Sequence, residues 1–313
     1  MNAGSIRTVD VLSAPFSGGQ CHSGVALGPQ SLFRAGLLRA ITDLKCKVNS
    51  ERIHLDFDTN SINSTACAVS NVTKEISERV YESTKKGHFP LLIGGDHSVS
   101  LGSISGLLRA REDTRVLWVD AHADINTPSI SKSGNYHGMP VSFLAKLETQ
   151  LGPHWEWLNS VPSLDLSHIA YVGLRDVDQA ERELLKRMGV LAFSMSDVDE
   201  LGIARVMRKA LKHLLGSSSS QKPKPPLHLS FDIDACDPSV APSTGTAVEG
   251  GLTYREAHYL CEAVASSGSL CSMDLVEINP ELGSPEERAK ETTAKAGIAF
   301  VSSALGKTVL GVP

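Results

Sequence analysis

The chain has 313 residues, of which 41% are hydrophobic and 21% are charged, a composition typical of a globular protein with a large buried core. Thirty Lys and Arg residues stand against 35 Asp and Glu, and this balance argues against a basic nucleic-acid-binding surface. No apolar run approaches the ~20 residues of a membrane span, and the six cysteines contain no CxxC pair. We therefore expect a cytoplasmic protein with reduced thiols, no targeting segment and a single domain over residues 1–313.

Apolar runs bounded by polar turns predict eight strands in chain order. They span residues 7–12, 53–57, 89–93, 115–119, 168–174, 191–195, 227–231 and 270–276. Helical periodicity predicts helices over residues 29–44, 69–86, 99–111, 140–146, 197–215, 253–267 and 284–305, and a further helix that contains Glu181. Strands that alternate with helices predict an α/β fold of three layers, with a mostly parallel eight-stranded sheet between helices.

Two segments between these elements need interpretation. Residues 14–28 are rich in glycine and proline, so they form either a surface loop or a wall of an active-site mouth. Residues 216–226 are rich in serine, lysine and proline and read as a surface connector. We do not interpret this connector as a domain boundary, because candidate ligands lie on both sides of it.

Three predicted strands end in potential metal ligands. Asp120-Ala121-His122-Ala123-Asp124 follows the strand at 115–119, His97 follows the strand at 89–93, and Asp232-Ile233-Asp234 follows the strand at 227–231. In an open α/β sheet, ligands bind beyond the carboxyl ends of the strands. The alternative is a set of strand-end turns with solvated carboxylates, and three such stretches in one chain make it the weaker interpretation.

Two imidazoles and four carboxylates are too many anionic ligands for one ion. They suit two divalent ions that share bridging carboxylates. The absence of thiolates argues against structural zinc, and the carboxylate majority favours Mn²⁺. We therefore expect two Mn²⁺ ions per chain, held by six ligands: His97, Asp120, His122, Asp124, Asp232 and Asp234.

Several motifs together resemble the ureohydrolase family and, within it, the arginases. They are Gly94-Gly95-Asp96-His97-Ser98, the run from Asp120 to Thr127, Ser133-Gly134-Asn135-Tyr136-His137-Gly138, and the run from Ser230 to Leu252. The resemblance extends from Ala14 to the last predicted helix. It implies one α/β domain around an eight-stranded parallel sheet, two Mn²⁺ ions, hydrolysis of a guanidino compound and a homotrimer.

The resemblance also implies how the six ligands divide. By the family pattern, one ion is held by His97, Asp120, Asp124 and Asp232. The other ion is held by Asp120, His122, Asp232 and Asp234. Asp120 and Asp232 would therefore bridge the two ions.

The reaction implied is the conversion of L-arginine and water to L-ornithine and urea, a step of arginine metabolism and the urea cycle. A hydroxide that bridges the two ions would attack the guanidinium carbon, and Asp124 would orient it. His137 would carry a proton to the leaving amine. Glu277 would pair with the guanidinium, beside Thr246. The alternatives are a solvated loop histidine, a surface carboxylate and a plain turn residue.

The other end of the substrate is expected to decide specificity. Asn126, Ser133 and Asn135 are neutral donors that suit an α-carboxylate. Asp178 and Glu181, at a predicted helix start, suit an α-ammonium, although acids there also favour the helix dipole. The Ser-Gly-Asn-x-His-Gly form resembles arginases more than agmatinases, so arginine is the expected substrate.

Two other classes of function stay open. One is a relative that keeps the metals but acts as an interaction or regulatory protein, against which the intact ligands and His137 argue. The other is a deacetylase-type hydrolase with a single catalytic zinc on a related fold. A metal count and a urea-release assay distinguish them.

Overall fold

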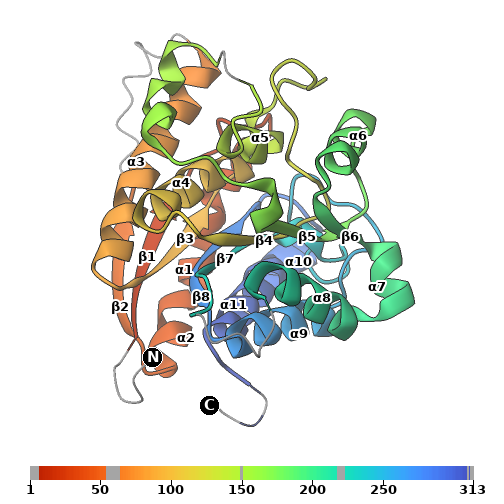
Figure 1. Cartoon of the computed structure of the whole chain (residues 1–313). Coiled ribbons are helices and arrows are strands. Elements are labelled where there is room, and N and C mark those ends of the chain that lie inside the picture. Colours follow the sequence, from red (N-terminus) through yellow and green to blue (C-terminus); the bar gives the residue numbers. More distant parts are fainter. Residues whose placement is uncertain (1–6, 54–63, 149–150, 217–222, 309, 311–313) are drawn as a thin grey trace.

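The computed structural model describes residues 7–53, 64–148, 151–216, 223–308 and 310 (Figure 1). Its eight strands form one sheet in the order β2-β1-β3-β8-β7-β4-β5-β6. All neighbouring strands are parallel. The strands are β1 (Thr8–Ala14), β2 (Lys47–Arg52), β3 (Phe89–Gly94), β4 (Arg115–Val119), β5 (Ile169–Leu174), β6 (Leu191–Ser194), β7 (Leu227–Asp232) and β8 (Leu270–Val276). The predicted α/β fold is confirmed, and its sheet is parallel throughout.

Helices cover both faces of this sheet (Figure 1). One face packs against α3 (Thr65–Lys85), α4 (Ser100–Ala110), α5 (Pro140–Leu144) and α6 (Gln179–Met188). The other packs against α1 (Gly28–Arg34), α2 (Leu37–Asp43), α8 (Ile203–Leu215), α9 (Tyr254–Ser266) and α11 (Thr292–Ala304). Successive side chains of β4 alternate between the two cores, with Trp118 in the first and Val119 in the second. The strands are apolar on both faces because both faces are buried.

Three segments that the sequence predicts as single helices are each broken in two. The breaks lie at Gly36 between α1 and α2 (φ 101°), at Gly202 between α7 (Met195–Leu201) and α8 (φ 73°), and at Glu291 between α10 (Pro285–Lys290) and α11 (φ 52°). A positive φ cannot continue a right-handed helix. The predictions were therefore correct in secondary structure but wrong in continuity.

The second strand lies upstream of its predicted position. The sequence predicts a strand at 53–57, of which all but Ile53 lies outside the described residues, whereas β2 is Lys47–Arg52. β2 is an edge strand with mostly exposed side chains, so its polar sequence carries no apolar run. Most of the predicted connector at 216–226 also lies outside the described residues. Among the helices that the structure describes, none is long and apolar enough to cross a membrane.

The order of the strands positions the candidate site. β3, β8, β7 and β4 are consecutive neighbours in the sheet, and all four point the same way. Their carboxyl ends therefore lie side by side. The ligands predicted from three separate stretches are brought to this one edge, together with Glu277, which directly follows β8.

Candidate active site

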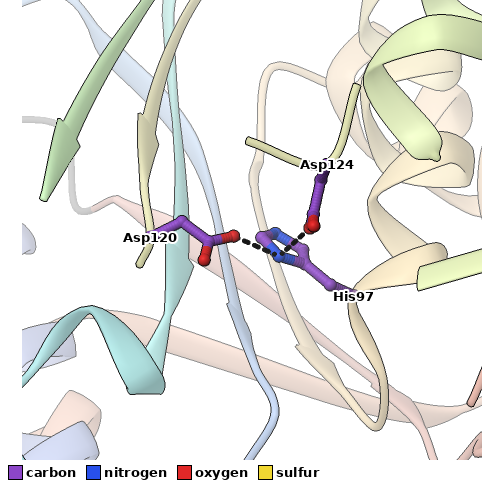
Figure 2. A group of neighbouring side chains, drawn as sticks. All are labelled: His97, Asp120 and Asp124. Carbon is purple, nitrogen blue, oxygen red and sulfur yellow. Dashed lines mark ion pairs between the residues drawn. The ribbon is translucent and has the colours of Figure 1, made fainter. Parts of the chain in front are cut away.

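The first group of candidate ligands surrounds the imidazole of His97 (Figure 2). Its Nδ1 lies 3.0 Å from Asp120 Oδ2, 3.0 Å from Asp124 Oδ2 and 3.2 Å from Asp232 Oδ2. The backbone of Asp124 has a φ of 50°, a left-handed conformation that is strained for a residue other than glycine. That turn directs its carboxylate back toward His97.

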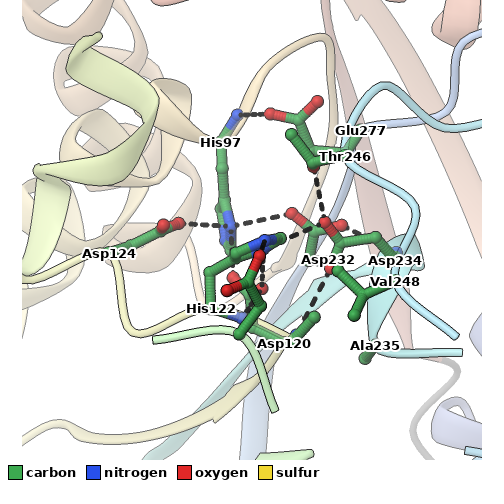
Figure 3. Close-up of polar contacts among 12 residues, drawn as sticks. His97, Asp120, His122, Asp124, Asp232, Asp234, Ala235, Thr246, Val248 and Glu277 are labelled. Carbon is green, nitrogen blue, oxygen red and sulfur yellow. Dashed lines mark hydrogen bonds and ion pairs between the residues drawn. The ribbon is translucent and has the colours of Figure 1, made fainter. Parts of the chain in front are cut away.

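The second group shares Asp120 with the first (Figure 3). His122 Nδ1 lies 3.3 Å from Asp120 Oδ1 and 3.2 Å from Asp234 Oδ2. Thr246, which the sequence predicts to lie beside the guanidinium, donates a hydrogen bond of 2.7 Å to Asp234 Oδ2 and thereby supports a candidate ligand. In each group, three ligand atoms lie within 4.8 Å of one another.

The chemistry of this donor set fits divalent cations. His97 Nδ1 is buried and has no hydrogen-bond partner, although three carboxylates face it. Burial and the charges of Asp234 and Asp120 raise the pKa of Asp232, and burial with the charge of Asp120 raises the pKa of Asp124 to about 6. Bound cations would use the free nitrogen and offset the repulsion among the carboxylates.

Residues behind the ligands hold His97 and Asp120 in place. His97 Nε2 lies 2.9 Å from Ser230 Oγ, and its ring stacks on Trp118 with a centroid separation of 4.2 Å. Trp118 Nε1 donates to Asp120 Oδ2 at 3.0 Å. A partner on the second nitrogen orients a metal-binding imidazole. The sequence did not predict this role for Ser230 and Trp118, because both belong to strands whose apolar pattern indicates only buried core residues.

The loop at 14–28, for which two interpretations were open, packs against residues next to the ligands, although none of its residues lines the cavity above them. The buried carboxylate of Asp96 accepts a hydrogen bond of 2.7 Å from Gly19 N, and Gly19 O accepts one of 3.1 Å from His137 N. A Cβ on Gly19 would lie 2.5 Å from Asp96 Oδ1, so the approach requires glycine. Burial and the charge of Glu277 raise the pKa of Asp96 to about 6.

Three donors reach the carboxylate of Glu277, and Figure 3 shows one of them, the backbone N–H of His97. Its Oε1 accepts a hydrogen bond of 2.8 Å from His97 N and lies 3.1 Å from His137 Nδ1. Its Oε2 accepts a bond of 2.6 Å from Gln20 Nε2. Gln20 was not predicted as a site residue. Glu277 has a φ of 65°, so this carboxylate too is presented by strained backbone.

In the metal-free protein, we expect the His137 imidazole to titrate near pH 9. Burial alone would lower its pKa, but the hydrogen bond and charge of Glu277 outweigh burial and raise it to about 9. The pairing stabilises the fold fully below the ordinary pKa of 6.5, and this stabilisation is lost as the pH rises through 9. An NMR titration of Glu277→Gln should show a lower pKa for His137, with His258 on α9 as the internal control. An unchanged pKa would mean that Glu277 is not the cause.

A polar cavity of ≈ 200 Å³ opens over the two groups. Its lining combines candidate ligands with most of the residues predicted to bind substrate: His122, Asp124, Asn126, Ser133, His137, Gly138, Asp176, Asp178, Glu181, Asp232 and Thr246. Asn135 lies outside this lining, at the start of the turn Tyr136–Gly138, where its N–H donates to Ser133 Oγ at 3.2 Å. Asp176 was not predicted, although it directly follows the strand-end residue Arg175. A larger hollow of ≈ 820 Å³ lies between α8 and α9, where neither group of ligands is found.

The two acids at the start of α6 have different surroundings. Asp178 is 43% exposed, and its carboxylate lies 3.4 Å from Asn126 Nδ2 and 3.7 Å from Lys132 Nζ. Glu181 is buried, and its two oxygens accept hydrogen bonds of 3.1 Å from Ile125 N and Asp178 N. Asp178 can therefore exchange Lys132 for another cation, whereas Glu181 already fixes the chain next to Asp124.

Known proteins resemble this chain over nearly its whole length. The sequence model of the Arginase family matches residues 7–306. The arginase of Neurospora crassa is 44% identical over 97% of this chain and 87% of that protein. The crystal structure of Bacillus subtilis arginase superimposes with a TM-score of 0.86 at 31% identity, covering 97% of this chain and all of that one. Entamoeba histolytica arginase, solved with L-ornithine, gives a TM-score of 0.83 at 30% identity, over 96% and 98% of the two chains.

Proposed function

This chain belongs to the arginase family and is a hydrolase of the guanidino carbon–nitrogen bond, and on that premise we propose that it converts L-arginine and water to L-ornithine and urea. The convergence of two imidazoles and four carboxylates beneath a small polar cavity carries the proposal. The relatives named arginase, one of them solved with L-ornithine, support the choice of substrate.

We propose two Mn²⁺ ions as the cofactors. His97, Asp120, Asp124 and Asp232 would hold one, and Asp120, His122, Asp232 and Asp234 would hold the other. Bound there, the ions would supply hydroxide near neutral pH and stabilise negative charge that develops on the substrate. Mixed nitrogen and oxygen ligands with a carboxylate majority support Mn²⁺ over a structural zinc ion.

The remaining residues of the site would orient the reactants and move the proton. Asp124 reaches the cavity, where it would accept a hydrogen bond from the attacking nucleophile. Glu277 is buried beside the cavity and does not line it; an ionised carboxylate offers about four acceptor positions, three donors already reach this one, and we propose that the fourth would accept a guanidinium N–H. Thr246, on the cavity wall, would stand beside that group. His137, protonated at neutral pH in the metal-free protein, would give its proton to the leaving amine.

The outer part of the cavity would select the amino-acid end of arginine. Asn126 and Ser133 line it and would donate to the α-carboxylate, with Asn135 holding the loop. Asp178 would accept the α-ammonium in place of Lys132. Glu181 would act through the backbone of Asp178 and Ile125. Agmatine lacks both the carboxylate and the ammonium, so it would leave these groups unpaired.

The test is urea release by the Mn²⁺-loaded protein, with arginine and agmatine assayed side by side and metal content measured on the same sample. We expect about two ions per chain and a strong preference for arginine. Two ions without urea release would instead indicate an interaction or regulatory protein. One ion without urea release would indicate the deacetylase-type alternative.

We further propose that the protein is a homotrimer, which rests on the family resemblance, and that it acts in the cytoplasm, which rests on the reduced thiols expected from its cysteine pattern. Light scattering at micromolar concentration should give three times the chain mass of 33.4 kDa. A stable monomer at that concentration would contradict the trimer.

A further inference from the structure

The guanidinium of Arg175 lies against the chain segments that carry the second group of ligands. Arg175 follows β5 and is partly buried, and it points its N–H groups at main-chain oxygens only. Its Nη2 donates to Asp234 O at 2.6 Å and to Val248 O at 2.7 Å, and its Nε donates to Val248 O at 3.2 Å. Longer bonds of 3.2–3.3 Å reach the carbonyl oxygens of Gly173, Ala235 and Cys236.

This partnership is unusual for a charged side chain. Within the described residues, no carboxylate forms an ion pair with Arg175, and all the hydrogen bonds of its side chain go to carbonyl oxygens, while the charges of Asp234 and Asp120 lie near enough to favour the cation. Such charge-assisted bonds are stronger than neutral ones, and a planar guanidinium directs five donors in fixed directions. The arrangement therefore holds several backbone segments in one geometry.

The segments that Arg175 joins all lead to the second group of ligands. The carbonyls of Asp234 and Ala235 belong to the turn that carries the Asp234 carboxylate. Val248 lies two residues beyond Thr246, whose hydroxyl bonds to that carboxylate. The N–H of Arg175 itself donates at 2.9 Å to the carbonyl of Ala121, next to His122.

Space for the guanidinium is built into the opposite loop. A Cβ on Gly251 would lie 2.6 Å from Arg175 Nη2 and also 2.6 Å from the backbone atoms Asp237 N and Cys236 C, so a larger residue there would clash with both the guanidinium and the chain that it holds. The absence of a side chain at this position lets the loop close over the guanidinium.

The first group of ligands is held by other means. Ser230 and Trp118 support His97, and the carboxylate of Glu277 accepts the N–H of His97. None of the hydrogen bonds of Arg175 reaches Asp124 or the turn that begins at His97. In the proposed site both ions share Asp120 and Asp232, but the ligands that belong to one ion alone, His97 on one side and Asp234 on the other, have separate supports.

We propose that the Arg175 side chain is a positioning group for one metal ion only: it fixes the turn that presents Asp234 and the loop that carries Thr246, and it leaves the ion at His97 unaffected. This inference rests on the proposed dinuclear site. Because Arg175 lies far from Asp234 and Val248 in sequence, this role cannot be recognised from the sequence alone.

The experiment compares Arg175→Lys with the wild-type protein. Lysine keeps the positive charge but has a compact ammonium instead of a planar guanidinium. It therefore cannot make the same hydrogen bonds to both the Asp234 turn and the Val248 loop. Arg175→Gln, which keeps two planar donors without the charge, is the second variant. Arg109→Lys is the matched control. The guanidinium of Arg109 is also partly buried, but it pairs with Glu78, on a helix outside the site.

Two readouts are needed, and neither is activity. The first is a titration of the metal-free protein with Mn²⁺, followed by calorimetry and by counting of bound ions. In both Arg175 variants, one of the two sites should weaken by about 10–100-fold, the range found when a supporting residue of a metal site is lost. The other site, and both sites of Arg109→Lys, should stay within about twofold of wild type. Equal weakening of both sites, or of neither, would overturn the proposal.

The second readout is amide hydrogen exchange in the metal-free proteins. Loss of the guanidinium should speed exchange in 233–236 and 246–252 but not in the turn that follows β3. Unchanged exchange in those two segments would overturn the proposed role of Arg175, regardless of how many Mn²⁺ ions the variants bind. A wild-type protein that binds fewer than two ions would instead overturn the dinuclear site on which the proposed function rests.

Discussion

Replacing His97 with asparagine is expected to leave a folded protein that loses one divalent ion much more readily than the other and releases urea at least ~10²-fold more slowly. Even a lost supporting residue costs about 10–100-fold in metal affinity, and His97 is itself a candidate ligand. Its Nδ1 is the nitrogen that faces Asp120, Asp124 and Asp232, and it has no other partner. The change should leave the ion between His122 and Asp234 in place.

His88→Asn is the matched control for this variant. His88 also pairs with a carboxylate, Asp10, at 3.0 Å, but it lies outside both groups of ligands. Metal content and urea release should be unchanged in the control. Complete removal of metal from the wild type should stop urea release, and addition of Mn²⁺ should restore it. Equal activity in metal-free and Mn²⁺-loaded protein would rule out the dinuclear mechanism.

His97→Asn and Arg175→Lys should give mirror-image results. The first removes a ligand of one ion, and the second releases the backbone that presents ligands to the other. Together they would show that the two ions can be lost separately although Asp120 and Asp232 would serve both. Loss of both ions from both variants would mean that the shared carboxylate couples the sites too strongly for separate supports to matter.

The ligands were predictable from sequence because each one follows an apolar strand. A run such as Arg115–Val119 predicts both the strand and the place where it ends. The carboxyl ends of parallel strands lie along one edge of the sheet. The sequence did not reveal which strands are neighbours. β3, β8, β7 and β4 are adjacent in the sheet although β8 lies last in the chain, and this order alone brings Glu277 against His97.

Residues that act through contacts distant in sequence could not be found in this way. Gln20 and Glu277 are 257 residues apart, and nothing near Gln20 marks it as the partner of a strand-end carboxylate. Arg175 bonds to carbonyl groups, which every residue possesses, so its partners leave no trace in the sequence. The break at Gly36 is hidden because the apolar stripe continues from Leu32 through Leu37 to Ile41, and periodicity carries no information on a positive φ.

The Asp178→Ala variant is expected to lower kcat/KM for arginine by roughly 10²-fold, on the order of 3 kcal/mol of transition-state binding. Without Asp178, the α-ammonium of bound arginine loses the charged partner that the site provides for it. Asp178 is remote from the ligand groups, so its binding energy would serve to orient the guanidinium over the metals. In the free protein its carboxylate lies 3.7 Å from Lys132 Nζ, a weak exposed pair that the substrate ammonium would displace.

Agmatine provides the comparison for this variant, because it has no α-ammonium to lose. Its turnover, already poor, should change much less than that of arginine, and two ions should remain bound. Glu183→Ala is the matched control, since Glu183 is an exposed carboxylate on the same helix that bonds to Gln179. It should leave both substrates unaffected. If Asp178→Ala slowed arginine and agmatine by the same factor with both ions retained, the assignment of Asp178 to the α-ammonium would be wrong, and its part in the site would be to hold Asn126 instead.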